Sequence, residues 1–172
     1  MQRFIVTGGL GFIGSNLIKL LLSKKFKVLN IDKANYASNT YNVKDFAKNK
    51  RYSFIKTDIN NQKKILEILK KFKPHGIFNL AAETHVDRSI DGPKDFFYSN
   101  TLGVFNLLEA FKKFYKKYKH TKLIHISTDE VYGDILKGRC TETWPYKPSS
   151  PYAASKASSD HIVFSYFRTF NL

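Results

Sequence analysis

Short apolar runs alternate along this chain with longer segments in which apolar residues recur at helical spacing. The apolar runs predict five strands, at Arg3–Thr7, Lys27–Ile31, Tyr52–Lys56, Gly76–Leu80 and Lys122–Ile126. The helical spacing predicts helices over Ser15–Lys24, Asn61–Phe72, Lys94–Tyr118 and Pro151–Phe170, the third with an interruption near Gly103. The remaining polar segments predict a short helical turn over Asp45–Lys50 and loops over Asn35–Asn42, Glu83–Gly92 and Gly133–Ser150.

The alternation of strand and helix predicts the class of fold. Strands separated by helices imply a parallel sheet wound by right-handed crossovers, so we expect an α/β, Rossmann-type doubly wound parallel sheet. The chain has no internal repeat, low-complexity tract or interdomain linker, and we therefore expect one domain over residues 1–172. Ligands of such sheets bind beyond the carboxyl ends of the strands, which is where functional residues are expected.

Glycines follow the first predicted strand at a regular spacing. Gly8, Gly11 and Gly14 stand between this strand and the first helix, where small residues let the backbone approach a pyrophosphate at the helix N-terminus. Asp32 closes the second strand, and its carboxylate suits the two hydroxyls of an adenosine ribose and would repel a 2′-phosphate. The combination predicts NAD in preference to NADP, although the neighbouring Lys33 weakens the discrimination.

Two acidic residues at strand ends leave alternatives open. Asp32 can also be a plain turn residue at the end of its strand. Asp58 and Ile59 follow the third strand, where they could hold the edge of an adenine ring. Taken alone, Asp58 could equally cap the helix that follows.

A second group of titratable residues follows the fifth predicted strand. Thr128, Asp129 and Glu130 lie where chemistry is expected in an open α/β sheet. Tyr152 and Lys156 are four residues apart and therefore share one face of the last helix. A lysine there favours the phenolate and lowers the pKa of the tyrosine, which suits a general base. The plainer interpretation is that the two acids belong to a turn and that the tyrosine–lysine spacing is chance.

The charge of the chain is strongly positive, at +15, from 29 Lys and Arg against 14 Asp and Glu. The lysines are dispersed and alternate with apolar residues at helical spacing, as in Lys63–Phe72, which is typical of a solvated face over a core face. We therefore expect no nucleic acid and a modest attraction for an anionic small substrate, although a general lysine bias of the source would explain the charge equally well. No apolar run approaches the roughly 20 residues of a membrane span, and no signal-peptide pattern is present. The single cysteine, Cys140, allows no internal disulfide and fits a reducing cytoplasm.

Together these motifs resemble the extended short-chain dehydrogenase/reductase family and, within it, the dTDP-glucose 4,6-dehydratases. The glycine motif, Asp32, Ser127 and the Tyr152/Lys156 pair carry the broad resemblance. Three segments carry the narrower one, and they are Ala81–Ile90, Ser127–Gly133 and Tyr152–His161. Related epimerases usually have two small residues at the positions where this chain has Asp129 and Glu130. The resemblance extends over essentially all 172 residues.

The resemblance implies that the chain binds NAD and a nucleotide sugar. The residues that it assigns to NAD are Gly8, Gly11, Phe12, Ile13, Gly14, Asp32, Lys33, Asn35, Asp58, Ile59, Leu80, Ala81, Ala82, Ser99, Tyr152 and Lys156. Thr84 and Thr128 would bind the sugar, whereas His85 is as readily structural as it is a substrate contact. Nothing in the residues selects dTDP over UDP as the nucleotide.

The reaction implied by the resemblance is a redox-neutral dehydration. Tyr152, as phenolate, would remove the proton of the sugar O4 while hydride leaves C4 for NAD⁺, with Thr128 hydrogen-bonded to O4 and Lys156 on the nicotinamide ribose. The 4-ketone then acidifies C5, where Glu130 would be the base while Asp129 protonates the departing C6 hydroxyl. Such a pair requires pKa values that are pushed apart. Return of hydride to C6 gives a 4-keto-6-deoxy sugar nucleotide.

The resemblance also implies more chain than is present, because the family continues with at least one further strand and a C-terminal region that binds the nucleotide and sugar. We therefore expect a fragment with a sheet incomplete at its C-terminal edge, in which inactivity is favoured over activity. The alternatives are a related sugar-nucleotide epimerase or UDP-sugar dehydratase, and a non-catalytic NAD-binding fragment. The full-length form is expected to be a homodimer through the Lys94–Tyr118 and Pro151–Phe170 helices.

Overall fold

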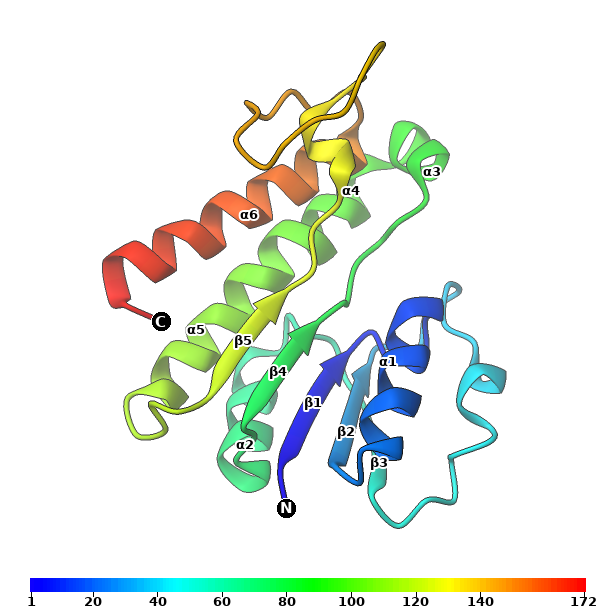
Figure 1. The fold of residues 1–172 in the computed structure, drawn as a ribbon, viewed down its shortest axis with the longest axis vertical. Helices are drawn as coiled ribbons and strands as arrows, with labels where there is room; N and C mark the ends of the chain where they lie inside the picture. Colours follow the sequence, from blue (N-terminus) through cyan, green and yellow to red (C-terminus); the bar gives the residue numbers. More distant parts are fainter.

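A five-stranded parallel sheet forms the centre of the molecule (Figure 1). The computed structural model describes all 172 residues. The strands are β1 Arg3–Thr7, β2 Lys27–Asp32, β3 Tyr52–Lys56, β4 Gly76–Asn79 and β5 Lys122–His125. Their order in the sheet is β3-β2-β1-β4-β5, so the winding reverses beside β1. This topology confirms the predicted Rossmann-type doubly wound fold.

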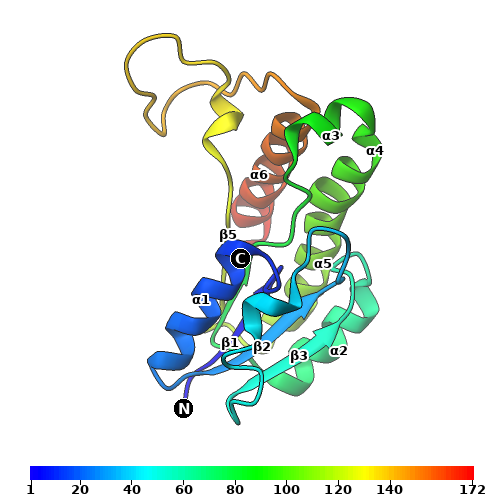
Figure 2. The ribbon, with the colours of Figure 1, turned by 90° about the vertical axis from the view of Figure 1, so that its right-hand side faces the viewer.

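Helices cover both faces of the sheet. The α-helices are α1 Phe12–Ser23, α2 Gln62–Phe72, α3 Val86–Asp91, α4 Pro93–Phe96, α5 Gly103–Tyr115 and α6 Pro151–Phe170. Two short 3₁₀ helices, η1 Thr40–Val43 and η3 Asp129–Tyr132, and one π-helix, η2 Phe97–Leu102, complete the elements. Helix α1 lies on one face, while α2 and α5 lie on the other (Figure 2). Helix α6 packs along α5. No helix combines the length and the apolar character that a membrane crossing requires.

The period of two along the central strands divides the core into two layers. Ile5 and Ile77 are buried against α2 and α5, together with Phe111. Val6, next to Ile5 in β1, is buried on the opposite face against Ile18 of α1. Because strand neighbours point to opposite faces, a sheet covered on both sides requires unbroken apolar runs, which is the pattern of these strands. Because all neighbouring strands are parallel, the carboxyl ends of the five strands lie at the same edge of the sheet.

The segment Glu83–Gly92, predicted as a loop, contains the short helix α3. Its polar sequence has no helical period of apolar residues, so periodicity could not reveal it. Tertiary contacts stabilise it instead: the hydroxyl of buried Ser89 donates to the carbonyl of Val86 and accepts the backbone N–H of Tyr152 at 3.1 Å. Helix α3 is thereby attached to the start of α6.

One other prediction needs correction, and the long helix agrees with its predicted interruption. The helical turn predicted over Asp45–Lys50 is a series of hydrogen-bonded turns, and the nearby 3₁₀ helix lies just before it at Thr40–Val43. The long helix predicted over Lys94–Tyr118 is divided into α4, η2 and α5, with α5 beginning at Gly103, where the interruption was expected. The wider turns of η2 carry Ser99 and Asn100, both buried and both hydrogen-bonded to loops above the sheet. Such π segments often occur at functional sites.

Candidate nucleotide-binding site

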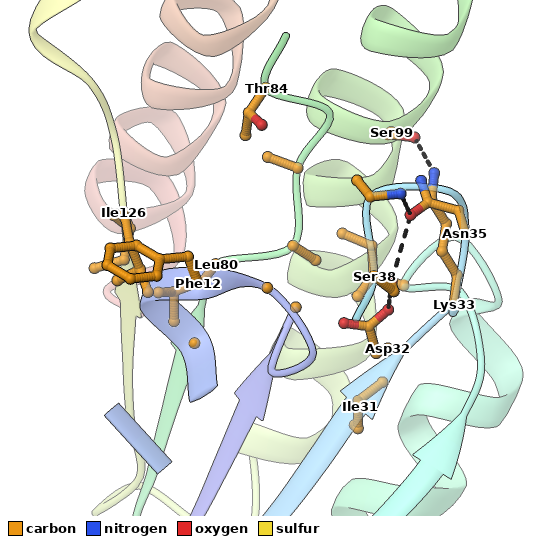
Figure 3. Close-up of a pocket in the computed structure, with 18 of the residues that line it drawn as sticks. Phe12, Ile31, Asp32, Lys33, Asn35, Ser38, Leu80, Thr84, Ser99 and Ile126 are labelled. Carbon is orange, nitrogen blue, oxygen red and sulfur yellow. Dashed lines mark hydrogen bonds between the residues drawn. The ribbon is translucent and has the colours of Figure 1, made fainter. Parts of the chain in front are cut away.

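A cavity of about 480 Å³ opens above the carboxyl ends of the strands (Figure 3). Its walls come from the β1–α1 turn, the ends of β2 and β3, the segment after β4, helix η2 and helix α6. Every residue predicted to hold NAD lines this cavity, as does Thr84. The structure thus brings together residues that are as far apart in the sequence as Gly8 and Lys156; their roles toward a cofactor remain predictions.

The turn between β1 and α1 has no room for a side chain at Gly8 or at Gly14. Gly8 has a φ of 69°, a left-handed conformation, and a Cβ there would meet the backbone N of Ala81 at 2.8 Å. A Cβ at Gly14 would meet the carbonyl oxygen of Gly8 at 2.3 Å. Helix α1 begins immediately after Gly11, so its unpaired N–H groups and its dipole favour an anion at this point of the cavity. The turn therefore fits a pyrophosphate.

Asp32 stands at the end of β2 with only 7% of its surface exposed. One carboxylate oxygen accepts the backbone N–H of Leu10 at 3.0 Å, and the other accepts the N–H of Ala34 and the hydroxyl of Ser38, both at 2.8 Å. It is thus a turn residue and a cavity residue at once, so the two interpretations of its sequence position are compatible. Figure 3 shows Ser38 joined to Asp32 at this end of the cavity.

Asp58 also lines the cavity, and the alternative that it caps α2 is wrong. The side chain that caps α2 belongs to Asn61, which accepts the N–H of Lys64 at 3.0 Å. The carboxylate of Asp58 accepts the N–H of Asn60 at 2.8 Å, within the turn that precedes the cap. His85, whose role was open, lines the cavity as well and directly precedes α3.

Tyr152 and Lys156 lie on the face of α6 that borders the other end of the cavity. Lys156 is 4% exposed, and its ammonium donates to the carbonyl of Ile126 at 2.6 Å. Burial lowers the pKa of Lys156 to about 8, and the negative charge of Asp160 opposes this shift. The ammonium is therefore still charged at neutral pH.

The expectation that Lys156 lowers the pKa of Tyr152 is not met in this structure. Burial raises the pKa of the Tyr152 hydroxyl, the nearby charges of Glu130 and Asp129 raise it further, and a hydrogen bond with Thr128 lowers it. The physical reason is that two carboxylates and a low-dielectric wall all disfavour a phenolate, while the lysine ammonium is directed at a backbone carbonyl.

Thr128, Asp129 and Glu130 do not line the cavity but lie beside it at the start of η3. The Thr128 hydroxyl accepts the N–H of Glu130 at 3.3 Å and so caps this short helix. Burial, followed by the charge of Asp129, raises the pKa of Glu130. The charges of Asp129 and Glu130 and the hydroxyl of Thr128 all affect the pKa of the Tyr152 hydroxyl. The predicted catalytic residues therefore lie around this one hydroxyl.

A buried polar network runs beneath the site from β1 to α6. Thr7 donates to Asn79 at 2.6 Å, and the Asn79 amide donates to the Nδ1 atom of His125 at 3.0 Å. Burial and the charge of Lys156 lower the pKa of His125 to about 3, so its 3.5 Å approach to Asp160 is a contact of a neutral ring and not an ion pair. The Asp160 carboxylate also accepts the hydroxyls of Ser127 and Tyr146. This network ties the strand ends to the helix that carries Tyr152.

Sequence reasoning missed several residues of the cavity. They are Ile31, Ala37, Ser38, Thr57, Ile126 and Ser127, the last of which carried the resemblance without an assigned role. Ser38 could have been suspected, because a serine in the polar loop after Asp32 is well placed to donate to its carboxylate. Glu83 was missed as well: it stands inside the Ala81–Ile90 motif, yet only the structure shows that it is buried and paired.

The fold and this site define a nucleotide-binding domain of the Rossmann type. The chain belongs to the family described as GDP-mannose 4,6 dehydratase, whose model matches residues 5–172. Among its relatives are the dTDP-glucose 4,6-dehydratases of Neisseria meningitidis serogroup B, 42% identical, and of Haemophilus influenzae, 44% identical. Both alignments cover 100% of this chain, but they cover only 51% of the Neisseria protein and 53% of the Haemophilus protein. The chain thus spans about half the length of these relatives, and the resemblance seen in its motifs is confirmed.

Solved structures of similar proteins agree with this assignment. The dTDP-glucose 4,6-dehydratase DesIV from Streptomyces venezuelae, solved with NAD, has a TM-score of 0.92 and 38% identity over 99% of this chain and 53% of its own. The UDP-glucose 4-epimerase of Thermus thermophilus, also solved with NAD, has a TM-score of 0.86 and 34% identity over 99% of this chain and 52% of its own. Both dehydratases and epimerases share the fold, so the fold alone does not distinguish the two reactions.

Proposed function

We propose that this chain is the NAD-binding half of a nucleotide-sugar 4,6-dehydratase, with dTDP-glucose as the substrate of the whole enzyme. One observation carries the proposal: a single cavity joins the glycine turn and Asp32 at one end to Tyr152 and Lys156 at the other. This layout suits a dinucleotide with its pyrophosphate at α1 and its adenosine ribose at Asp32. When bound, NAD⁺ supplies the hydride acceptor for oxidation of the sugar at C4.

The chain's own residues can handle the proton at O4. Tyr152 would take this proton as a phenolate, a form that the cationic nicotinamide would favour against the burial that raises the pKa of its hydroxyl, and Thr128 would hold the same oxygen. Lys156, with a pKa of about 8, keeps a positive charge next to the cavity at neutral pH. A fixed positive charge in a water-poor site stabilises negative charge that develops on a nearby oxygen.

The adjacent acids would carry out the elimination of water. We assign Glu130 as the base at C5, since a carboxylate whose pKa is raised is a stronger base once it is ionised. Asp129 would protonate the departing C6 hydroxyl. The charge of Asp129 is among the causes of the raised pKa of Glu130, so the two groups are electrostatically coupled.

Binding of NAD⁺ to the chain itself is the first prediction. Asp32→Ala is expected to weaken NAD⁺ binding by about tenfold or more, because charge-assisted hydrogen bonds to the ribose hydroxyls are lost. Isothermal titration calorimetry measures the change, with Asp45→Ala as the matched control, since Asp45 is an exposed carboxylate that does not line the cavity. Equal affinity in wild type and Asp32→Ala would contradict the assignment.

Dehydration is the second prediction. The chain spans about half the length of its relatives, so it is assayed both alone and fused in place of the matching half of the Haemophilus influenzae enzyme. With NAD⁺ and dTDP-glucose, product is expected as a sugar nucleotide lighter by one water that absorbs in alkali. The combined change Asp129→Asn and Glu130→Gln is expected to lower its rate by at least about a hundredfold, as removal of an acid–base pair does.

The control for this assay is Glu142→Gln, which changes an exposed acid in the loop before α6 and is expected to leave the rate unchanged. A fusion that binds NAD⁺ but forms no product would contradict the proposed reaction. Undiminished product from the Asp129/Glu130 variant would contradict the assigned acid and base, and accumulation of a C4 epimer would identify an epimerase instead.

We also propose that the whole enzyme is a homodimer and works in the cytoplasm. Support for the dimer comes from exposed aromatic side chains on neighbouring helices, namely Phe105 on α5 and Phe164 and Phe167 on α6, which are 40%, 60% and 58% exposed. Light scattering of the purified protein measures the oligomeric state, and a monomer at all concentrations would contradict it. The single free cysteine, Cys140, fits a reducing compartment.

A further inference from the structure

The side chain of Lys33 lines the cavity, and its ammonium is paired with groups of the protein. Its ammonium lies 2.6 Å from a carboxylate oxygen of Glu83 and 2.9 Å from the hydroxyl of Ser99. Figure 3 shows the bond to Ser99 above the Asp32 end of the cavity. Glu83 is 3% exposed, so this is a pair between a lysine at the cavity and a buried carboxylate.

The carboxylate of Glu83 also fastens the rest of the turn after β2. It accepts the side-chain amide of Asn35 at 2.7 Å and the hydroxyl of Tyr36 at 2.9 Å. Ala34, between the two bound residues Lys33 and Asn35, has a φ of 54°, a left-handed conformation that costs about 1 kcal/mol in a residue other than glycine. The hydrogen bonds to Glu83 offset that cost, and they fix the direction of both neighbouring side chains.

Glu83 itself is rigidly placed. Its backbone N–H donates to the side chain of Asn100 at 2.8 Å, and the amide of Asn100 donates back to the Glu83 carbonyl at 2.9 Å. Asn100 lies in η2 next to Ser99, the second partner of Lys33. The π-helix and the segment after β4 therefore form one fixed support for the lysine.

This arrangement bears on which dinucleotide the cavity accepts. An adenosine 2′-phosphate needs a cation beside it, and Asp32 supplies a negative charge at that end. Of the residues that line the cavity only Lys33 and Lys156 are basic apart from His85, and Lys156 lies at the opposite end on α6. With Lys33 paired to Glu83, the lining of the cavity has no unpaired lysine or arginine at the Asp32 end.

We propose that Glu83 is a specificity-determining residue: by pairing with Lys33 it withholds the counter-charge that a 2′-phosphate requires, and so makes the cavity select NAD⁺ over NADP⁺. The inference rests on the proposed binding of NAD. It also resolves the ambiguity in the sequence, where Lys33 taken alone weakens the preference set by Asp32. The lysine strengthens the preference instead, because it holds the turn in which the N–H of Ala34 orients the Asp32 carboxylate.

The test compares NAD⁺ and NADP⁺ affinities by calorimetry for the wild type, Glu83→Gln and the double variant Glu83→Gln/Lys33→Met. Glutamine keeps the shape of Glu83 and removes its charge, which releases the lysine. Glu83→Gln is expected to strengthen NADP⁺ binding about tenfold and to change NAD⁺ binding by less than about threefold. The double variant is expected to lose the gain, because the released charge is gone.

Salt dependence gives an independent readout when the wild type is compared with the double variant, which has the same net charge. If Lys33 is paired, the wild type and the double variant are expected to show the same change of NADP⁺ affinity relative to NAD⁺ with added salt; if Lys33 is free to bind the phosphate, the wild type is expected to lose relative NADP⁺ affinity more steeply. An unchanged NADP⁺ affinity in a folded Glu83→Gln, or a steeper relative loss of NADP⁺ affinity with salt in the wild type than in the double variant, would overturn the inference while leaving NAD binding intact. A wild type that binds neither dinucleotide overturns the proposed function and this inference with it.

Discussion

Replacing Gly14 by Ala is expected to abolish measurable NAD⁺ binding and to lower the free energy of unfolding by about 3 kcal/mol. The added Cβ would stand 2.3 Å from the carbonyl oxygen of Gly8 and 2.8 Å from the Cα of Gly9. Both obstacles are backbone atoms, so the clash cannot be relieved by rotating a side chain. Either α1 moves away from the turn or the turn opens, and each movement removes the amide groups that face the cavity. Urea unfolding and calorimetry with NAD⁺ measure the two effects.

Alanine substitutions at three other glycines test whether the loss of stability follows the closeness of the Cβ contact. A Cβ at Gly11 would meet the carbonyl oxygen of Gly8 at 3.3 Å, and one at Gly92 would meet the carbonyl oxygen of Arg88 at 3.8 Å, an ordinary contact. Gly8 combines a 2.8 Å backbone contact with a φ of 69°. Alanine should therefore destabilise the protein most at Gly14 and Gly8, less at Gly11, and by no more than about 0.5 kcal/mol at Gly92. Equal losses at Gly14 and Gly92 would show that the close packing of this turn is not what stabilises it.

The parts of the fold that depend on local pattern could be predicted from the sequence. The bounds of β1 and β3 agree with the apolar runs, and α6 begins and ends at the predicted residues. In α6 the agreement has a local cause: Pro151 takes the first helical position, and the side chain of Ser150 caps the helix by accepting the N–H of Ala153 at 3.0 Å. Such signals are contained in a few adjacent residues.

The parts that depend on contacts between distant segments could not be predicted. Glu83 looks like a polar residue of a loop, and its role requires Lys33, 50 positions earlier in the chain, and Asn100, 17 positions later. The π-helix has no sequence period of its own and forms where Ser99 and Asn100 reach the neighbouring loops. The raised pKa of Tyr152 likewise arises from burial and from the approach of η3, neither of which follows from a tyrosine and a lysine spaced four apart.

The stability of the fold is expected to fall as the pH is lowered from about 6.5, and His125 is expected to be a main cause. Its pKa is about 3 in the folded protein against 6.5 ordinarily, so between these values the unfolded chain binds a proton that the folded chain does not. Stability conferred by the neutral ring is therefore fully present above pH 6.5 and is lost as the pH falls toward 3. One residue of this kind changes the free energy of unfolding by up to about 1.4 kcal/mol per pH unit.

His125→Gln isolates this contribution from that of the carboxylates, which also titrate in acid. Glutamine can accept from Asn79 and donate toward Ser159 as the neutral ring does, but it takes up no proton. Urea unfolding at several pH values between about 7 and 5 should show a steeper loss of stability in the wild type than in the variant. Identical slopes would mean that His125 binds its proton in the folded state, with Asp160 at 3.5 Å acting as an ion-pair partner after all. In that case the buried network from Thr7 to α6 would carry a positive charge next to Lys156 in acid, and this charge would add to the burial that lowers the pKa of that lysine.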